Sequence, residues 1–64
     1  MLIQELKRRW VVFPEVVEYT GLDHNRALRH IDNLSFQFPI AERKYDRWIW
    51  YKIMNKDDYK RRNA

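Results

Sequence analysis

The pattern of apolar and polar positions predicts helices in the first half of the chain and strands in the second. Apolar residues at helical spacing predict a first helix over residues 2–10, and these residues are Leu2, Ile3, Leu6 and Trp10. The β-branched and aromatic residues 10–13 come next, directly before Pro14. Because a proline pushes the preceding residue toward extended conformations, we expect an extended connector that ends at Phe13.

Residues 14–20 predict a short second helix, although their valines, tyrosine and threonine also suit a strand. Helix is favoured because the apolar positions would share one face and Gly21 follows as a C-cap. That shared face consists of Phe13, Val16, Val17 and Thr20. Pro14 fits the first turn of such a helix, where its missing N–H is not needed.

The clearest amphipathic pattern lies in residues 24–34 and predicts a third helix with Asp23 as its N-cap. The inward positions of this helix are Ala27, Leu28, Ile31 and Leu34. The outward positions are Asn25, Arg26, Arg29 and Asn33, with His30 at the margin between the two faces.

After Ser35 the apolar period changes from helical spacing to alternation, which indicates strands. A first strand over residues 36–41 would bury Phe36, Phe38 and Ile40, and Pro39 restricts it to a sheet edge or an irregular strand. Residues 42–47 predict a polar turn. A second strand over residues 48–54 would carry Ile49, Tyr51 and Ile53 on one face and Trp48, Trp50 and Lys52 on the other. Residues 55–64 predict a short helix or a flexible tail.

Composition limits the class of protein and the chemistry that it can perform. The 64 residues fit a single domain, 1–64. The chain has no cysteine and two histidines, so we expect no disulfide, no metal and no cofactor, and the composition suits a reducing cytoplasm. No apolar run approaches the roughly 20 residues that span a bilayer, so we expect no membrane partner. No catalytic motif and no small-molecule substrate are evident, and we do not expect an enzyme.

The basic residues fall into clusters that suit contact with a polyanion at several places. Thirteen Lys and Arg residues against nine Asp and Glu residues give a formal net charge of +4. The clusters lie at residues 7–9, 26–29, 43–47 and 60–62. A surface that charge merely keeps solvated is the alternative interpretation.

The order helix, helix, turn, helix, hairpin resembles a winged helix-turn-helix domain, an α+β fold with three helices followed by a two-stranded β-hairpin, the wing. The segment EVVEYTGLDHNRALRHIDNL is similar to the helix-turn-helix core of small prokaryotic and viral transcription regulators. The Thr20-Gly21-Leu22-Asp23 turn and the apolar positions Ala27, Ile31 and Leu34 carry the similarity. The resemblance covers about residues 2–54, and its specific part is residues 13–34.

The resemblance implies sequence-specific binding of double-stranded DNA. The helix at 24–34 would enter the major groove, where arginine can bond to guanine and asparagine to adenine. The candidate base contacts are Asn25, Arg26, Arg29 and Asn33, and the candidate backbone contacts are His30, Arg43, Lys44, Tyr45 and Arg47. Arg29 could instead pair with Asp32 on a plain polar surface, and a charged turn is common in proteins of other function.

Trp48 and Trp50 form a separate candidate site. If they face outward they indicate an interface, for which a homodimer is one candidate, since helix-turn-helix proteins often bind two half-sites. The first helix or the tail could instead cover them, or the two faces of the strand could be reversed. The rival function is therefore a winged-helix module that binds another protein through an exposed aromatic surface.

Overall fold

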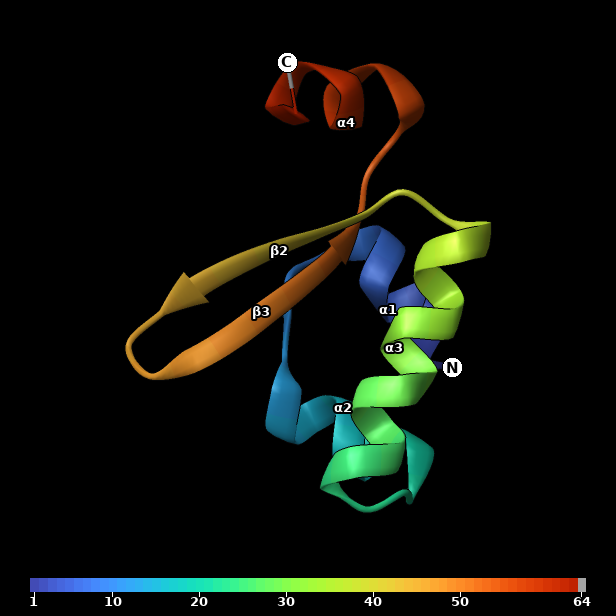
Figure 1. Cartoon of the computed structure of the whole chain (residues 1–64), viewed down its shortest axis with the longest axis vertical. Helices are drawn as coiled ribbons and strands as arrows, with labels where there is room; N and C mark the ends of the chain where they lie inside the picture. Colours follow the sequence, from blue (N-terminus) through green and yellow to red (C-terminus); the bar gives the residue numbers. More distant parts are fainter. Residues whose placement is uncertain (64) are drawn as a thin grey trace.

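The computed structural model describes the backbone of residues 1–63 and the side chains of residues 1–61. Within these residues the fold is α+β, with four helices and one three-stranded antiparallel sheet (Figure 1). The elements in chain order are α1 (Leu2–Arg8), β1 (Val11–Val12), α2 (Phe13–Thr20), α3 (His24–Gln37), β2 (Ile40–Tyr45), β3 (Trp48–Ile53) and α4 (Lys56–Asn63). The predicted α+β class is confirmed.

The first helix is shorter than predicted, because the chain becomes extended at Arg9 (φ −157°, ψ 169°). The Arg9 guanidinium donates from Nε to Glu5 Oε2 at 3.0 Å and from Nη2 to Glu15 Oε2 at 2.7 Å, so it ties the end of α1 to the start of α2. Trp10 therefore leaves the helical stripe in which the sequence pattern placed it. The predicted extended connector is confirmed as β1, which pairs with β3. It ends at Val12 and not at Phe13 as predicted, because Phe13 is already the first residue of α2.

The second helix and the turn that follows it agree with the prediction. Gly21 is left-handed (φ 68°, ψ 13°), a conformation that glycine adopts without the steric cost of a Cβ, and its N–H donates to Val17 O at 2.9 Å. Asp23 then begins α3, where its Oδ1 accepts a hydrogen bond from the Arg26 N–H at 2.8 Å.

Helix α3 continues one turn beyond the predicted residue 34, to Gln37, and the predicted strand start at residue 36 is wrong. Phe36 belongs to the helix, and its side chain is 88% exposed rather than buried. The helix ends where Phe38 becomes extended (φ −131°, ψ 147°), while the Phe38 N–H still donates to Leu34 O at 2.8 Å. Pro39 accounts for this boundary, because the residue before a proline is disfavoured in helical conformation.

The sheet has the order β1-β3-β2, so the predicted hairpin of β2 and β3 gains a short strand on one side. The hairpin turn is shorter than predicted, because β2 runs to Tyr45 and Tyr45 pairs with Trp48. Only Asp46 and Arg47 connect the strands, and both have positive φ (51° and 75°), as in the two-residue turns that match strand twist. The turn-proximal part of the hairpin extends away from the helices (Figure 1).

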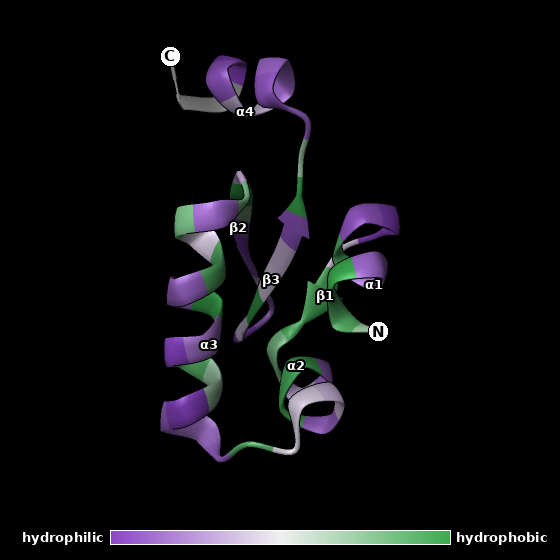
Figure 2. Cartoon of the chain, turned by 90° about the vertical axis from the view of Figure 1, so that its right-hand side faces the viewer, coloured by the Kyte–Doolittle hydropathy of each residue, from purple (hydrophilic) through white to green (hydrophobic). Residues whose placement is uncertain are grey.

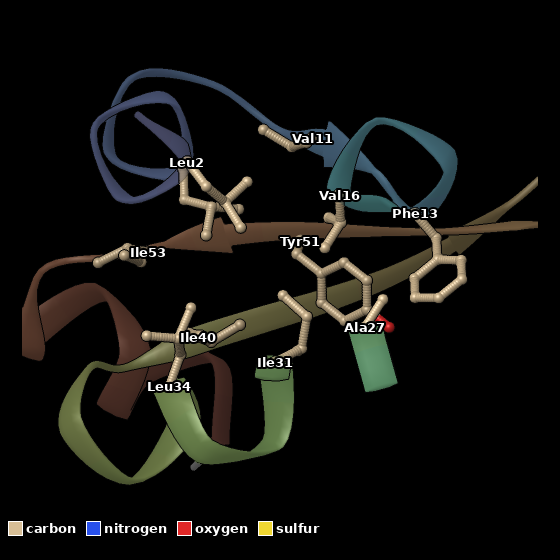
Figure 3. Close-up of a cluster of buried hydrophobic side chains, with 11 residues drawn as sticks. Leu2, Val11, Phe13, Val16, Ala27, Ile31, Leu34, Ile40, Tyr51 and Ile53 are labelled. Carbon is tan, nitrogen blue, oxygen red and sulfur yellow. The ribbon is translucent and has the colours of Figure 1, made fainter. Parts of the chain in front are cut away.

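The core lies where the inward faces of the helices meet one face of the sheet (Figure 3). Tyr51 is 1% exposed and lies near Val16, Ala27 and Ile31, while Ile40 lies beside Leu34. Burial of an aliphatic or aromatic side chain of this size stabilises the fold by roughly 1.5–3 kcal/mol. Hydrophobic residues follow the inner side of α3 and hydrophilic residues its outer side (Figure 2).

The predicted alternative of a short helix at the end of the chain is realised as α4. Asn55 caps this helix, since its Oδ1 accepts from the Asp58 N–H at 2.8 Å and its Nδ2 donates to Asp58 Oδ2 at 3.0 Å. The last residue of the predicted tail, Ala64, and the Arg62 side chain of the last basic cluster lie outside the described structure. None of the helices in residues 1–63 has the length and apolar character needed to cross a bilayer.

Candidate nucleic-acid interface

The outward face of α3 carries all four predicted base-contact residues, and each of their side chains is exposed. Three of them, Asn25, Arg26 and Arg29, line a shallow hollow of about 420 Å³ together with Asp23. Asn33 follows Arg29 by about one helical turn. The amide and guanidinium groups therefore form one polar surface on a helix whose opposite face is fixed in the core.

The two arginines of this surface differ in their electrostatic surroundings. Arg26 Nε lies 3.9 Å from Asp23 Oδ2, a distant pair between side chains that are 76% and 67% exposed. Arg29 has no carboxylate within 4.0 Å among the side chains that the structure describes, so the alternative pairing with Asp32 is not formed. The Arg29 guanidinium is thus the cation on α3 whose donors are available to an incoming acceptor.

Phe36 adds an apolar group to this polar surface. The sequence pattern did not place Phe36 there, because it assigned the residue to a strand. Phe36 follows Arg29 by seven residues and Asn33 by three, so the three side chains lie on the same outward line of the helix. The signal that could have located it was Pro39, because a helix commonly ends at the residue before a proline. A ring in this position has the chemistry to contact the methyl group of a thymine.

His30, a predicted backbone contact, lies apart from the arginine hollow. It is half-buried and lines a separate, mainly apolar hollow with residues that include Tyr19 and Leu22. The structure therefore places His30 toward α1 and α2 and not among the polar residues of the outward α3 face.

The predicted backbone contacts of the hairpin are exposed, but they do not form one cluster. Arg43 lies opposite Trp50 and Lys44 lies opposite Ile49, so the two cations point to opposite faces of the sheet. Tyr45, 67% exposed, shares the face of Arg43. Arg47 lies in the turn itself, at the tip of the hairpin.

The two predicted interface tryptophans differ in burial. Trp48 is exposed, with 49% of its surface accessible, whereas Trp50 is more deeply buried. The Trp50 indole N–H is buried and has no acceptor within hydrogen-bond distance in the described part of the chain. Trp50 lines a hollow of about 290 Å³ with Arg43, Tyr45 and Trp10, so residues from two separately predicted sites meet there. Trp10 is the member that the sequence interpretation missed.

The basic cluster at residues 7–9 is partly neutralised within the fold. Arg8 Nη1 lies 3.8 Å from Glu5 Oε1, and Arg9 bonds to both Glu5 and Glu15. The hydrogen bonds from Arg9 lower the pKa of Glu15 below its ordinary value, and those same bonds raise the pKa of Arg9. Arg9 holds α1 and α2 together, and Arg8 pairs within α1, so both are poorer candidates for phosphate contact than Arg29 or Arg47.

The described residues contain no group of three His, Cys, Asp or Glu side chains placed to hold a metal ion. Comparison of the chain with protein-family models, with curated proteins and with solved structures found no match. The candidate function therefore depends on the geometry of α3 and the hairpin.

Proposed function

We propose that the protein is a winged helix-turn-helix DNA-binding protein that regulates transcription, with α3 in the major groove of double-stranded DNA. The observation that carries the proposal is the outward face of α3, where Asn25, Arg26 and Arg29 gather around one exposed hollow. A major groove admits an α-helix, and these side chains are the ones that bond to adenine and guanine edges. The capped turn between α2 and α3 fixes the angle at which that face is presented.

The hairpin supports the proposal as the wing of the domain. Its exposed outer half contains Arg43, Lys44 and Arg47, and it extends away from the helices (Figure 1). Arg47 occupies a left-handed position (φ 75°) that glycine would adopt at lower energy. An arginine retained at that cost at the tip of the hairpin is consistent with a phosphate contact, which would position the protein without reading sequence.

The test is fluorescence anisotropy of a labelled random-sequence duplex at 50 mM and 200 mM salt, followed by selection of preferred sequences from a random library. Phosphate contacts release counterions, so the affinity should fall steeply between the two salt concentrations. Selection should then yield one enriched motif. Absence of duplex binding at 50 mM salt by the folded protein would refute the proposal.

A further inference from the structure

The sheet face that points away from the core carries an aromatic and cationic surface. The strand register places Arg43 opposite Trp50 and Tyr45 opposite Trp48. Alternation along β3 puts Trp48 and Trp50 on the side away from the buried Tyr51. Trp10, the residue before β1, lies on the same side, because it lines the same hollow as Trp50. All three tryptophans of the chain therefore lie on one face.

The hollow on this face combines three aromatic rings with one guanidinium. Its lining consists of Trp10, Arg43, Tyr45 and Trp50, and its volume is about 290 Å³. Arg43, Tyr45 and Trp50 belong to paired strands, and Trp10 is the residue that leads into β1. The backbone ladder therefore fixes their spacing. This volume lies just below the usual range for ligand pockets, about 300–1,000 Å³, so the hollow has room for one small group such as a single base.

The charge at the hollow selects the class of ligand. Aromatic rings by themselves also attract organic cations, but the positive charge of Arg43 in the wall opposes a cation. The complementary ligand has a flat π-system and a negative charge close to it. Arg47 at the turn adds positive charge beyond Arg43 along the strand direction, whereas Lys44 points to the other face of the sheet. A chain of nucleotides supplies both features, a base face and a phosphate, at a regular repeat.

We propose that this sheet face binds single-stranded nucleic acid, with one unpaired base stacked in the hollow and its phosphate on Arg43. Tyr45 and Trp48, which lie side by side near the turn, offer a second stacking position for the next base. Duplex DNA does not fit this site, because its bases are stacked on one another and do not expose their faces. The site lies on the opposite side of the sheet from the core face of α3, and it does not depend on duplex binding by α3.

The tryptophans provide a selective reporter for this site. Because all three lie on the sheet face, a base stacked there should quench the intrinsic fluorescence of the protein. A duplex bound by α3 alone should change this emission little. The two activities are therefore separable in one protein sample.

The experiment compares fluorescein-labelled dT12 with an abasic 12-mer that has the same phosphates and no bases. Anisotropy and tryptophan quenching are measured for the native protein, for Tyr45→Ala and for Phe36→Ala. Phe36→Ala is the matched control, since it removes an exposed ring from α3 and leaves the sheet intact. Arg29→Ala is measured as well, to report on duplex binding. Circular dichroism confirms that each variant is folded.

We expect dT12 to bind the native protein at least tenfold more tightly than the abasic strand, with quenching of tryptophan emission. Tyr45→Ala should weaken dT12 binding about fivefold and leave abasic binding unchanged, whereas Phe36→Ala and Arg29→Ala should not change dT12 binding. Equal affinity for dT12 and the abasic strand would overturn the proposal, as would a folded Tyr45→Ala variant with native affinity. A stable dimer that shields the tryptophans from acrylamide would also overturn it. Duplex binding is tested separately by Arg29→Ala, because Arg29 lies on α3 and outside this sheet face.

Discussion

Phe36 lies two helical turns beyond Arg29 on the outward face of α3, and its ring is 88% exposed. An exposed phenylalanine adds nothing to the core, and it lies in line with the guanidinium that lacks a carboxylate partner in the described structure. The same helix face therefore presents a bidentate donor and an apolar ring. In a major groove these two groups suit a guanine and a thymine whose separation matches about two turns of the α-helix α3.

Arg29→Ala should reduce specific duplex binding and leave the fold intact. One lost bidentate contact to guanine corresponds to roughly 1–3 kcal/mol, or about 5- to 150-fold in affinity. Stability should change little, because the Arg29 side chain is exposed and has no ion-pair partner among the described residues. Anisotropy with the selected duplex measures the affinity, and repeated selection should show relaxed preference at one position. Unchanged specificity in the folded variant would remove Arg29 from the reading surface.

Phe36→Ala should leave the stability nearly unchanged and should weaken binding only at sites that carry one particular thymine. Exposed substitutions usually change the free energy of unfolding by less than about 0.5 kcal/mol. Loss of a methyl contact of about 0.8 kcal/mol would weaken binding about fourfold. Each thymine of the selected duplex is replaced by uracil in turn. One such replacement should weaken duplex binding by the native protein and should not further weaken binding by Phe36→Ala. If every replacement weakened binding by both proteins equally, the contact between Phe36 and a thymine would be contradicted.

The spacing of apolar residues along the chain is sufficient to predict part of this fold. The helices that bury a regular apolar stripe, and the Gly21 and Asp23 caps between them, followed directly from residue spacing. The end of α3 did not, because Phe36 fits an apolar alternation as well as a helix, and the effect of Pro39 on Phe38 decided between them. The end of β2 was also missed, since both faces of the outer hairpin are solvated and the polarity of residues 42–45 resembles that of a loop.

The candidate site was predictable where it lies on one helix and not where it depends on strand pairing. The outward α3 residues follow from a single helical wheel. The hollow of Arg43, Tyr45, Trp50 and Trp10 requires the register of β2 with β3 and the pairing of β1 with β3. Both pairings join residues that are far apart in the sequence. Helical spacing alone does not contain this information, and it therefore places Trp10 in the first helix.

Arg47→Gly should stabilise the protein and weaken its binding to all nucleic acids that touch the hairpin tip. Glycine adopts the left-handed conformation of residue 47 without the Cβ penalty, so we expect a gain of about 1 kcal/mol in the free energy of unfolding. Loss of one phosphate contact should reduce the slope of log affinity against log salt by about 1, equally for all sequences. Urea unfolding and anisotropy measure the two effects. Arg47→Lys keeps the charge and serves as the control. If Arg47→Lys lost as much affinity as Arg47→Gly, the result would argue against a contact made by charge.

Glu15→Gln should remove part of the acid sensitivity of the fold. Hydrogen bonds from Arg9 lower the pKa of Glu15 in the folded state, so this carboxylate stabilises the fold at neutral pH. That contribution is lost as the pH falls through and below about 4.3, the ordinary glutamate value. Because the Arg9 and Glu15 side chains are 42% and 35% exposed, solvent screens the pair and the effect should be modest. Thermal unfolding between pH 3 and pH 7 should show a shallower pH dependence for Glu15→Gln, with Glu18→Gln, an exposed neighbour on α2, as the control.

We expect the native protein to lose stability in alkali through the titration of Tyr51, and Tyr51→Phe should remove that part of the loss. Burial is the main cause that raises the pKa of Tyr51 to about 12 from its ordinary value of 10.0, and the nearby carboxylates of Glu42 and Asp32 add to it. The folded state therefore keeps a proton that the unfolded chain has released above pH 10. The stabilisation is complete below pH 10 and is lost as the pH rises toward 12, a change on the order of 2 kcal/mol.

The measurement is urea unfolding of both proteins at pH 9, 10 and 11. The native protein should lose stability more steeply than Tyr51→Phe, and the difference between the two slopes isolates Tyr51 from the lysines and the other tyrosines that titrate in the same range. Tyr45→Phe is the control, because Tyr45 is 67% exposed at the hairpin. Parallel curves for the native protein and Tyr51→Phe would mean that the hydroxyl reaches solvent, in conflict with its place between β3 and the inner side of α3.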